Sequence, residues 1–284
     1  MLMLPCAMAG TVLLLVPGYT GLLEHPAMTV QVAGYAPFAA TVLAAYLLVS
    51  WALLRWVDRR PFGALGLRLD RRALLGLLVG CGIALLNGLV AAGAVQALGL
   101  ARGAASAGWD GPVKEAGVLT ALAMVLFIVL RAFVLQGIGE EVLFRGYLMQ
   151  SLRRRPVLAV LVAAVAFTIP HLLSNGGQQS PFEHLHYLAI PFGFALSAGF
   201  LAVAMRSVWA AIGIHGGFHL ATIAAGMLGL TADGPPAWLA LGLLHAVTGT
   251  VIALLVPRRR WAEVRRHGPY GRRTITDGGG SASR

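Results

Sequence analysis

Two adjacent glutamates close a long apolar stretch of the chain. Residues 116–139 hold a single charged residue, Arg131, and Glu140 and Glu141 follow at once. A charged side chain at the centre of a membrane costs at least about 2.5 kcal/mol, so such residues persist where they are paired or used in chemistry. On a helix, Glu141 lies one turn before Arg145 and can form an ion pair with it, whereas Glu140 is rotated by about 100° and needs a different partner.

Histidines in other apolar runs are candidate partners for this second carboxylate. His171 follows Phe167 by four residues, and His219 follows His215 by four, so each pair shares one helical face. A carboxylate beside imidazoles in a cavity of low dielectric constant is a setting for a general base. A lone histidine in a membrane helix is more often a hydrogen-bonding contact between helices, and we interpret His245 in that way.

These groups can reach a common depth. Glu140 precedes the arginine turn at Arg155 by 15 residues and His171 follows it by 16, which on antiparallel helices places both about 23 Å from that turn. The other two histidines follow Arg206 by 9 and 13 residues, which corresponds to about 14 and 20 Å. We therefore expect one polar layer inside the bilayer, built from three separate segments.

Such a layer needs a membrane-spanning scaffold, and the composition predicts one. The 284 residues are 58% hydrophobic and 12% charged, with a mean hydropathy of +0.77, whereas globular chains carry about 25% charged residues. The fold class that follows is an all-α, polytopic membrane helical bundle. The net charge of +11 does not indicate nucleic-acid binding, because the basic residues lie between the apolar runs and in the tail.

Eight apolar runs are long enough, or nearly so, to cross a bilayer. Of the 22 basic residues, 18 fall on one side of the alternating runs and only Arg102 and Lys114 on the other, which predicts that both termini are cytoplasmic. Since 21 of the 22 are Arg, as is typical of a GC-rich bacterial genome, we expect a multi-pass protein of the bacterial inner membrane. The runs are 1–23, 34–57, 73–99, 117–148, 157–174, 186–205, 208–230 and 236–256.

The domain organisation follows from these runs. We predict a single transmembrane bundle over residues 1–256, with a catalytic core at about 117–230, and a basic, disordered cytoplasmic tail over 257–284. Two pairs of glycines have the spacing of close helix contacts. They are Gly76 with Gly80 and Gly213 with Gly217.

The order of the polar residues resembles the CAAX protease and bacteriocin-processing family of intramembrane proteases, whose members include the type II prenyl-protein CAAX endopeptidases. The Glu-Glu-x-x-x-Arg motif of that family is matched by Glu140, Glu141 and Arg145. Its Phe-x-x-x-His motif, on the next helix, is matched by Phe167 and His171.

A third family motif is His-x-x-x-Asn, or a similar polar residue in the last place. His215 matches its first position, and His219 stands where the family has Asn. An Asn amide donates a hydrogen bond at any pH, whereas a neutral imidazole donates only from the correct tautomer. The exchange therefore preserves the donor, shifts the pH optimum or marks lost activity. The resemblance covers about residues 136–225.

The resemblance implies roles for these side chains. Glu140, helped by His171, would activate a water for attack on a peptide carbonyl. His215 and His219 would stabilise the resulting oxyanion, which is commonly the largest electrostatic contribution to acyl transfer. The supporting residues, which hold the helix and orient the site, would be Glu141, Arg145 and Phe167.

Metal binding is left open by the sequence. Glu140, His171 and His215 would supply three ligands and leave a fourth position for water, as catalytic zinc sites require. There is no His-Glu-x-x-His motif in the chain. We favour a glutamate and histidine mechanism without an obligatory ion, so no cofactor is assigned and zinc remains the alternative.

The function predicted in this way is an intramembrane endopeptidase that hydrolyses a peptide bond at membrane depth. Its partners would be a peptide or membrane-protein substrate and the lipid bilayer, with no nucleic acid. The alternative is a catalytically inactive membrane scaffold or immunity protein of the same fold, which the exchange at His219 suggests. A transporter that uses buried ionisable residues ranks last, because the chain shows no repeated halves.

Overall fold

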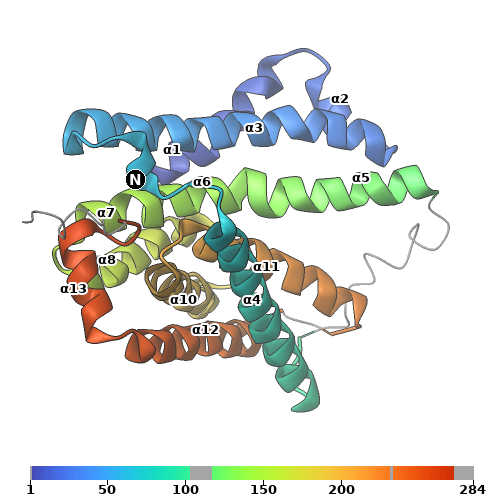
Figure 1. Cartoon of the computed structure of the whole chain (residues 1–284). Coiled ribbons are helices and arrows are strands. Elements are labelled where there is room, and N and C mark those ends of the chain that lie inside the picture. Colours follow the sequence, from blue (N-terminus) through green and yellow to red (C-terminus); the bar gives the residue numbers. More distant parts are fainter. Residues whose placement is uncertain (1, 103–116, 231–232, 272–284) are drawn as a thin grey trace, which may run out of the picture.

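A computed structural model describes residues 2–102, 117–230 and 233–271. Within these ranges the regular structure is helical, with no β-strand, which confirms the all-α bundle (Figure 1). In chain order the elements are α1 (Met3–Ala7), η1 (Ala9–Leu15), α2 (Tyr19–Leu23), α3 (Met28–Ala52), η2 (Leu53–Asp58), η3 (Phe62–Leu65), α4 (Arg71–Ala97), α5 (Val118–Val129), η4 (Leu130–Gly137), α6 (Ile138–Glu141), η5 (Val142–Leu148), α7 (Met149–Ser151), α8 (Pro156–Thr168), η6 (Ile169–Leu173), α9 (Pro181–Tyr187), α10 (Ala189–Met205), α11 (Val208–Met227), α12 (Pro235–Leu255) and α13 (Arg258–His267).

Seven helical segments of the described chain are long and apolar enough to cross a membrane, consistent with the expected number of about eight. Several consist of consecutive elements that continue one helix, such as α5 to α7. The chain is therefore a multi-pass membrane protein. The segments are Met28–Asp58, Arg71–Ala97, Val118–Ser151, Pro156–Leu173, Pro181–Met205, Val208–Met227 and Pro235–Leu255.

The first apolar run differs from the continuous helix that we expected. It is divided into α1, η1 and α2, and Pro17 with Gly18, which has a φ of +79°, separates η1 from α2. The Tyr46 hydroxyl donates to Met3 O at 3.3 Å and the Tyr19 hydroxyl to Gly34 O at 2.5 Å. The run thus lies antiparallel along α3 as a broken segment (Figure 1).

Polar caps define where two of the long helices begin. Asp70 precedes α4 and accepts hydrogen bonds from the backbone N–H groups of Arg72 and Ala73 at 3.0 and 3.1 Å. Ser207 precedes α11 and accepts from the N–H of Trp209 at 3.3 Å. Each side chain satisfies N–H groups that have no acceptor within the helix.

Small residues let α4 and α11 approach each other closely, as the glycine spacing predicts. A Cβ added at Gly217 of α11 would lie 2.7 Å from the Cα of Cys81 on α4. Cβ atoms at Gly80 and Gly213 would overlap backbone carbonyl oxygens of the facing helix. The two predicted glycine pairs therefore belong to one helix–helix contact, and α11 is the helix that carries His215 and His219.

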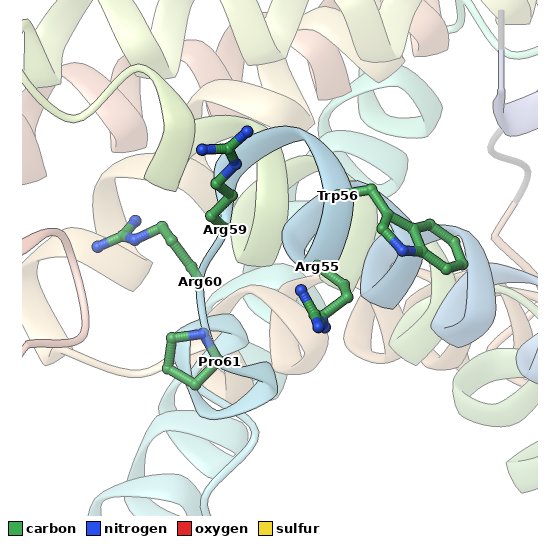
Figure 2. Close-up of a pocket in the computed structure, with 5 residues that line it drawn as sticks. All are labelled: Arg55, Trp56, Arg59, Arg60 and Pro61. Atoms are coloured by element: carbon green, nitrogen blue, oxygen red, sulfur yellow. The ribbon is translucent and has the colours of Figure 1, made fainter.

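Arginines gather at one end of the bundle, which we call the arginine-rich end and define by residues 55–60, 153–155 and 258–266. In Figure 1 this is the left side, where α7 and α13 lie. Figure 2 shows Arg55, Arg59 and Arg60 around a surface pocket of about 470 Å³, together with Trp56 and Pro61. The positive-inside rule predicts that this end faces the cytoplasm.

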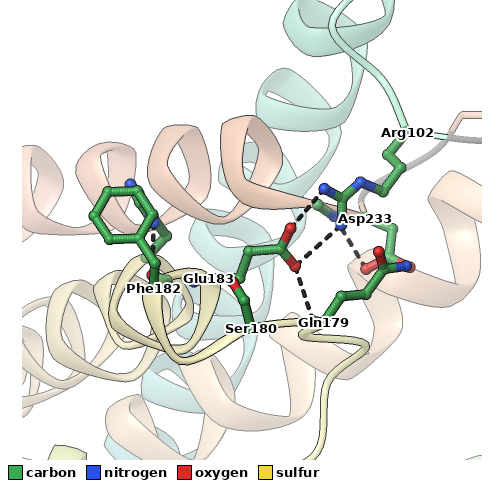
Figure 3. Close-up of polar contacts among 8 residues, drawn as sticks. Arg102, Gln179, Ser180, Phe182, Glu183 and Asp233 are labelled. Carbon is green, nitrogen blue, oxygen red and sulfur yellow. Dashed lines mark hydrogen bonds and ion pairs between the residues drawn. The ribbon is translucent and has the colours of Figure 1, made fainter.

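The opposite end carries few basic residues and is tied together by an ion pair (Figure 3). Both guanidinium nitrogens of Arg102 contact Glu183, at 2.6 and 3.0 Å. The N–H of Gln179 donates to the same carboxylate at 2.9 Å, and Ser180 caps α9 by accepting from the N–H of Glu183 at 3.2 Å. These contacts join the segment after α4 to the start of α9. Lys114 lies outside the described residues.

The predicted disordered tail is wrong for its first part, because residues 258–267 form α13. Arg260 is only 4% exposed and donates from Nε to Val203 O at 2.9 Å. Burial, with Arg206 nearby, lowers the pKa of Arg260 to about 10, so the side chain stays charged at neutral pH. Those contacts anchor α13 to the bundle. Residue 1 and residues 272–284, which the prediction placed in the cytoplasm, lie outside the described residues.

The segment that follows α13 also contacts the interior of the bundle. The Tyr270 hydroxyl donates to Arg145 O at 3.0 Å. Burial and the negative charge of Glu141 raise the pKa of the Tyr270 hydroxyl, so it remains a donor. At Gly66, which has a φ of +79°, an added Cβ would collide with the Tyr270 ring. The chain after α12 is therefore part of the packed structure.

Candidate active site

The segment that carries the two glutamates is not a regular α-helix. The four residues of α6 lie between η4 and η5, two stretches with the wider π-helical winding. Such stretches are rare, and they occur frequently at functional sites. The apolar pattern of 117–148 gives no sign of them. Their effect is to set the direction of Glu140, Glu141 and Arg145 differently from a straight α-helix.

Glu141 contacts two neighbouring side chains, the cation Arg145 and the ring of His215. Arg145 Nη1 lies 2.9 Å from each carboxylate oxygen of Glu141, and both side chains are completely buried. His215 Nδ1 lies 3.1 Å from Glu141 Oε1. Arg145 Nη2 donates to Ala195 O at 3.1 Å. The expected pair between Glu141 and Arg145 is present, and it also fixes the ring of His215.

Two phenylalanines cover this buried ion pair. The guanidinium carbon of Arg145 lies 4.8 Å from the ring centre of Phe167 and 5.8 Å from that of Phe194. Phe194 in turn contacts the ring of His215 edge-on, with 5.1 Å between centres. Ring faces attract a desolvated guanidinium, so they stabilise the charge at this depth. Phe167 was predicted as a supporting residue, whereas Phe194 was not, because it lies in a uniformly apolar run.

His171 lies at the end of the same helix as Phe167. The turn η6 follows α8 there, and the ring of His171 stands 4.7 Å from that of Phe167. His171 Nδ1 lies 2.8 Å from Phe167 O. A carbonyl oxygen only accepts, so Nδ1 carries the hydrogen, and a neutral ring then leaves Nε2 as an acceptor.

His215 and His219 form a stack on α11. Their ring centres are 5.5 Å apart with 30° between the planes. His215 uses Nδ1 for Glu141, which leaves Nε2 as its free nitrogen. His219 Nε2 is buried and has no hydrogen-bond partner among the described residues. An unpartnered buried nitrogen is costly, and this one is suited to contact a bound water or substrate.

Glu140 stands apart from this network. It is only 4% exposed, and within the described part of the chain it forms no hydrogen bond and no ion pair. Its electrostatic neighbours include His215 and Arg145. No hydrogen bond joins Glu140 directly to His171 among the described residues. Of the two adjacent buried carboxylates, Glu141 is paired with Arg145 and His215, and Glu140 forms no bond with the described residues.

The described residues do not fit a three-ligand metal site. No group of three His, Cys, Asp or Glu side chains among them is arranged to hold an ion. His171 and His215 each have Nδ1 engaged, as metal-bound histidines usually do, but Glu140 does not complete a set with them.

His245 belongs to a separate polar cluster. Ser197 Oγ donates to Phe194 O at 2.8 Å, so it accepts from His245 Nδ1 at 2.9 Å. Asn87 Nδ2 donates to Thr248 Oγ1 at 3.2 Å beside it. The cluster links α4, α10 and α12, as expected for a histidine that forms a contact between helices.

Comparison with known families agrees with this arrangement. Residues 122–221 match the family model described as type II CAAX prenyl endopeptidase Rce1-like. The match covers the central segment of the chain, which is similar to this family. No curated protein and no solved structure matches the chain.

The Rce1-like segment includes every predicted site residue from Glu140 to His219. Its family supports a membrane-embedded peptidase, and the seven apolar helices place it in a bilayer. His245 and Tyr270 lie outside the matched segment. Tyr270, Phe194 and the carbonyl of Ala195 are the contacts that sequence reasoning missed, because none of them interrupts a polar or apolar pattern.

Proposed function

We propose that the chain is an intramembrane endopeptidase in which Glu140 is the general base. The proposal rests on the different contacts of the two glutamates. Glu141 holds Arg145 and His215, whereas Glu140 is buried beside them with no bond of its own. A buried carboxylate without a partner is unfavourable unless it binds something, and a water is the simplest ligand.

The proposed reaction is a hydrolysis without a covalent intermediate. Glu140 takes a proton from a water while the water oxygen attacks the carbonyl carbon of the peptide. His171 Nε2 accepts a hydrogen bond from the same water and orients it. The proton held by Glu140 then passes to the amide nitrogen as the C–N bond breaks, which gives a carboxylic acid and an amine. Transfer of the acid proton to the amine then yields a carboxylate and an ammonium group.

Two donors are assigned to the oxyanion. His219 would donate from Nε2, the atom that has no partner among the described residues. His215 directs Nδ1 to Glu141, so Nε2 is the ring nitrogen assigned to the oxyanion. Glu141 and Arg145 do not touch the substrate in this proposal. They position the ring of His215 and the π-helical turn.

The proposed substrate is a peptide segment that lies in the membrane. The family description names prenylated CAAX peptides, so these are the first class to test. The arginine distribution and the Arg-for-Lys bias support a bacterial inner membrane, where the peptides would be pheromones, bacteriocin leaders or membrane-protein segments.

The test is cleavage of a panel of such peptides by the purified full chain in lipid. Glu140→Gln should lower the rate by about 100-fold to 10,000-fold, as expected for loss of a general base. Glu24→Gln removes the same charge from an exposed position and should leave the rate unchanged. A zinc chelator should have no effect.

Other outcomes would overturn the proposal. Cleavage by Glu140→Gln at the wild-type rate would remove the assigned base. Loss of activity with the chelator, restored by added zinc, would require a metal mechanism. If no peptide is cleaved and Glu140→Gln complements a deletion of the gene, the chain is a scaffold or immunity protein.

A further inference from the structure

A second pocket at the arginine-rich end is formed by two segments far apart in the sequence. It has a volume of about 550 Å³ and lies between the turn that begins α8 and one face of α13. Neither this pocket nor the one in Figure 2 includes the two glutamates. The pocket is lined by Arg154, Arg155, Pro156, Val157, Leu158, Arg258, Trp261 and Arg265.

The four arginines of this pocket carry positive charge that the described protein does not balance. None of them forms an ion pair in the part of the chain that the structure describes. The acidic residue of α13, Glu263, is already engaged, since it lies 2.5 Å from Arg206 and 3.5 Å from Arg260. Four like charges around one cavity repel each other, so an anion bound there would be strongly favoured.

The start of α8 adds to this field. Pro156 occupies the first turn of α8, a helix of 13 residues, and Val157 and Leu158 follow it. Backbone N–H groups of a first turn have no acceptor within the helix, and the helix dipole is positive at this end. The pocket therefore offers both guanidinium and backbone donors to an oxyanion.

The pocket also lies at the boundary of the apolar region. Pro156 begins one membrane-spanning segment and Leu255 ends another, just before α13. Leu158 is 45% exposed and Leu255 is 75% exposed, so apolar side chains face outward beside the arginines. Trp261 packs edge-on against Phe200 with 6.2 Å between ring centres, and tryptophan is typical of the lipid interface. A ligand with an anionic head and apolar chains matches this surface.

We propose that this pocket binds the phosphate group of an anionic phospholipid, with the acyl chains beside α8 and α12. The Figure 2 pocket is less suited to this ligand, because Arg55, Arg59 and Arg60 come from one segment and point in different directions. Arg60 is also already bonded to Gln150 at 3.3 Å.

The experiment uses two double variants of the full chain with equal changes of charge. Arg258→Gln with Arg265→Gln removes two arginines that line the pocket. Arg259→Gln with Arg266→Gln removes two exposed arginines of the same helix, seven residues apart like the first pair, that do not line it. Both proteins are purified in detergent, and binding of phosphatidylglycerol and phosphatidylcholine is measured by native mass spectrometry.

The wild type should retain phosphatidylglycerol and not phosphatidylcholine. The pocket variant should bind phosphatidylglycerol about 30-fold more weakly, since each basic residue near an anionic surface contributes about fivefold. The control variant should bind like the wild type. Melting temperatures of both variants close to that of the wild type would show that the loss is local.

Three results would overturn the proposal. Equal losses in the two variants would indicate a diffuse charge effect without a site. Equal binding of the two lipids would remove the role of the anionic head. Displacement of phosphatidylglycerol by millimolar inorganic phosphate, with no contribution from the acyl chains, would assign the pocket to free phosphate. If the pocket variant melts early, Arg154→Gln alone, in the turn outside α13, tests the same ligand.

Discussion

Glu140 and Glu141 are chemically identical neighbours with different surroundings. Glu141 has Arg145 on one side and His215 on the other, so its charge is compensated where it is fully buried. Glu140 is also buried, but it forms no hydrogen bond or ion pair with the described residues. A buried ion pair of this kind stabilises the structure because removing one partner leaves the other charge buried and uncompensated. The proposed general base is therefore the carboxylate that forms no structural bond.

We expect Glu141→Gln to destabilise the protein more than Glu140→Gln does. It leaves the charge of Arg145 buried without a counter-ion, which costs about 3 kcal/mol or more. Thermal unfolding in detergent measures the difference, with Glu24→Gln as the exposed control. Equal melting temperatures for the two buried variants would contradict the structural role of Glu141.

His219 offers a test of the oxyanion site. His219→Asn keeps a hydrogen-bond donor at this position, so activity should persist. His219→Ala removes the donor and should lower kcat about 100-fold or more. Cleavage rates with the same peptide distinguish the two variants. An Asn variant as inactive as the Ala variant would show that the imidazole itself is required.

Part of the site could be read from the sequence at this scale. The spacing of Glu141 and Arg145 predicts their pair, and the motif order identifies His171 and His215. The contacts of Phe194 and Tyr270 could not be read, because a phenylalanine in an apolar run and a tyrosine in a basic tail carry no distinguishing pattern. Their roles depend on which helices lie next to Arg145.

At the scale of elements, the site depends on departures from regular helix. Two π-helical stretches surround α6, and α8 ends in the turn that holds His171. Hydrophobic runs predict where such helices lie, and seven of the expected spans are found. Hydrophobic runs do not show whether a helix has α-helical or π-helical winding. They also do not show that the first run is interrupted at Pro17 and Gly18.

The close contact between α4 and α11 can be tested by replacing a glycine in it with a larger residue. Gly217→Leu should force the helices apart, displace His215 and cost about 1–3 kcal/mol. Gly226→Leu on the same helix is the matched control, because a Cβ there meets nothing within 4 Å. Unfolding temperature and cleavage rate should both fall for the first variant alone. Similar losses for the control would mean that helix propensity, and not packing, is responsible.

For the whole molecule, the separation of charge predicts one orientation. In a background without Cys6 and Cys81, a cysteine at the exposed Arg154 should react with an impermeant maleimide only after the cells are opened. A cysteine at the exposed Asn175, at the other end of α8 and η6, should react in intact spheroplasts. The reverse pattern would place the arginine-rich end outside and contradict the positive-inside assignment.

The hydrogen bond from Tyr270 to Arg145 can form only late in the synthesis of the protein. Ribosomes deliver Arg145 to the membrane 125 residues before Tyr270. Until α13 has been translated and has docked, the carbonyl in the π-helical turn lacks this donor, and the turn that follows the glutamates is free to rewind. A nascent chain would then be a poor hydrolase, which would spare the membrane peptides that surround it during insertion.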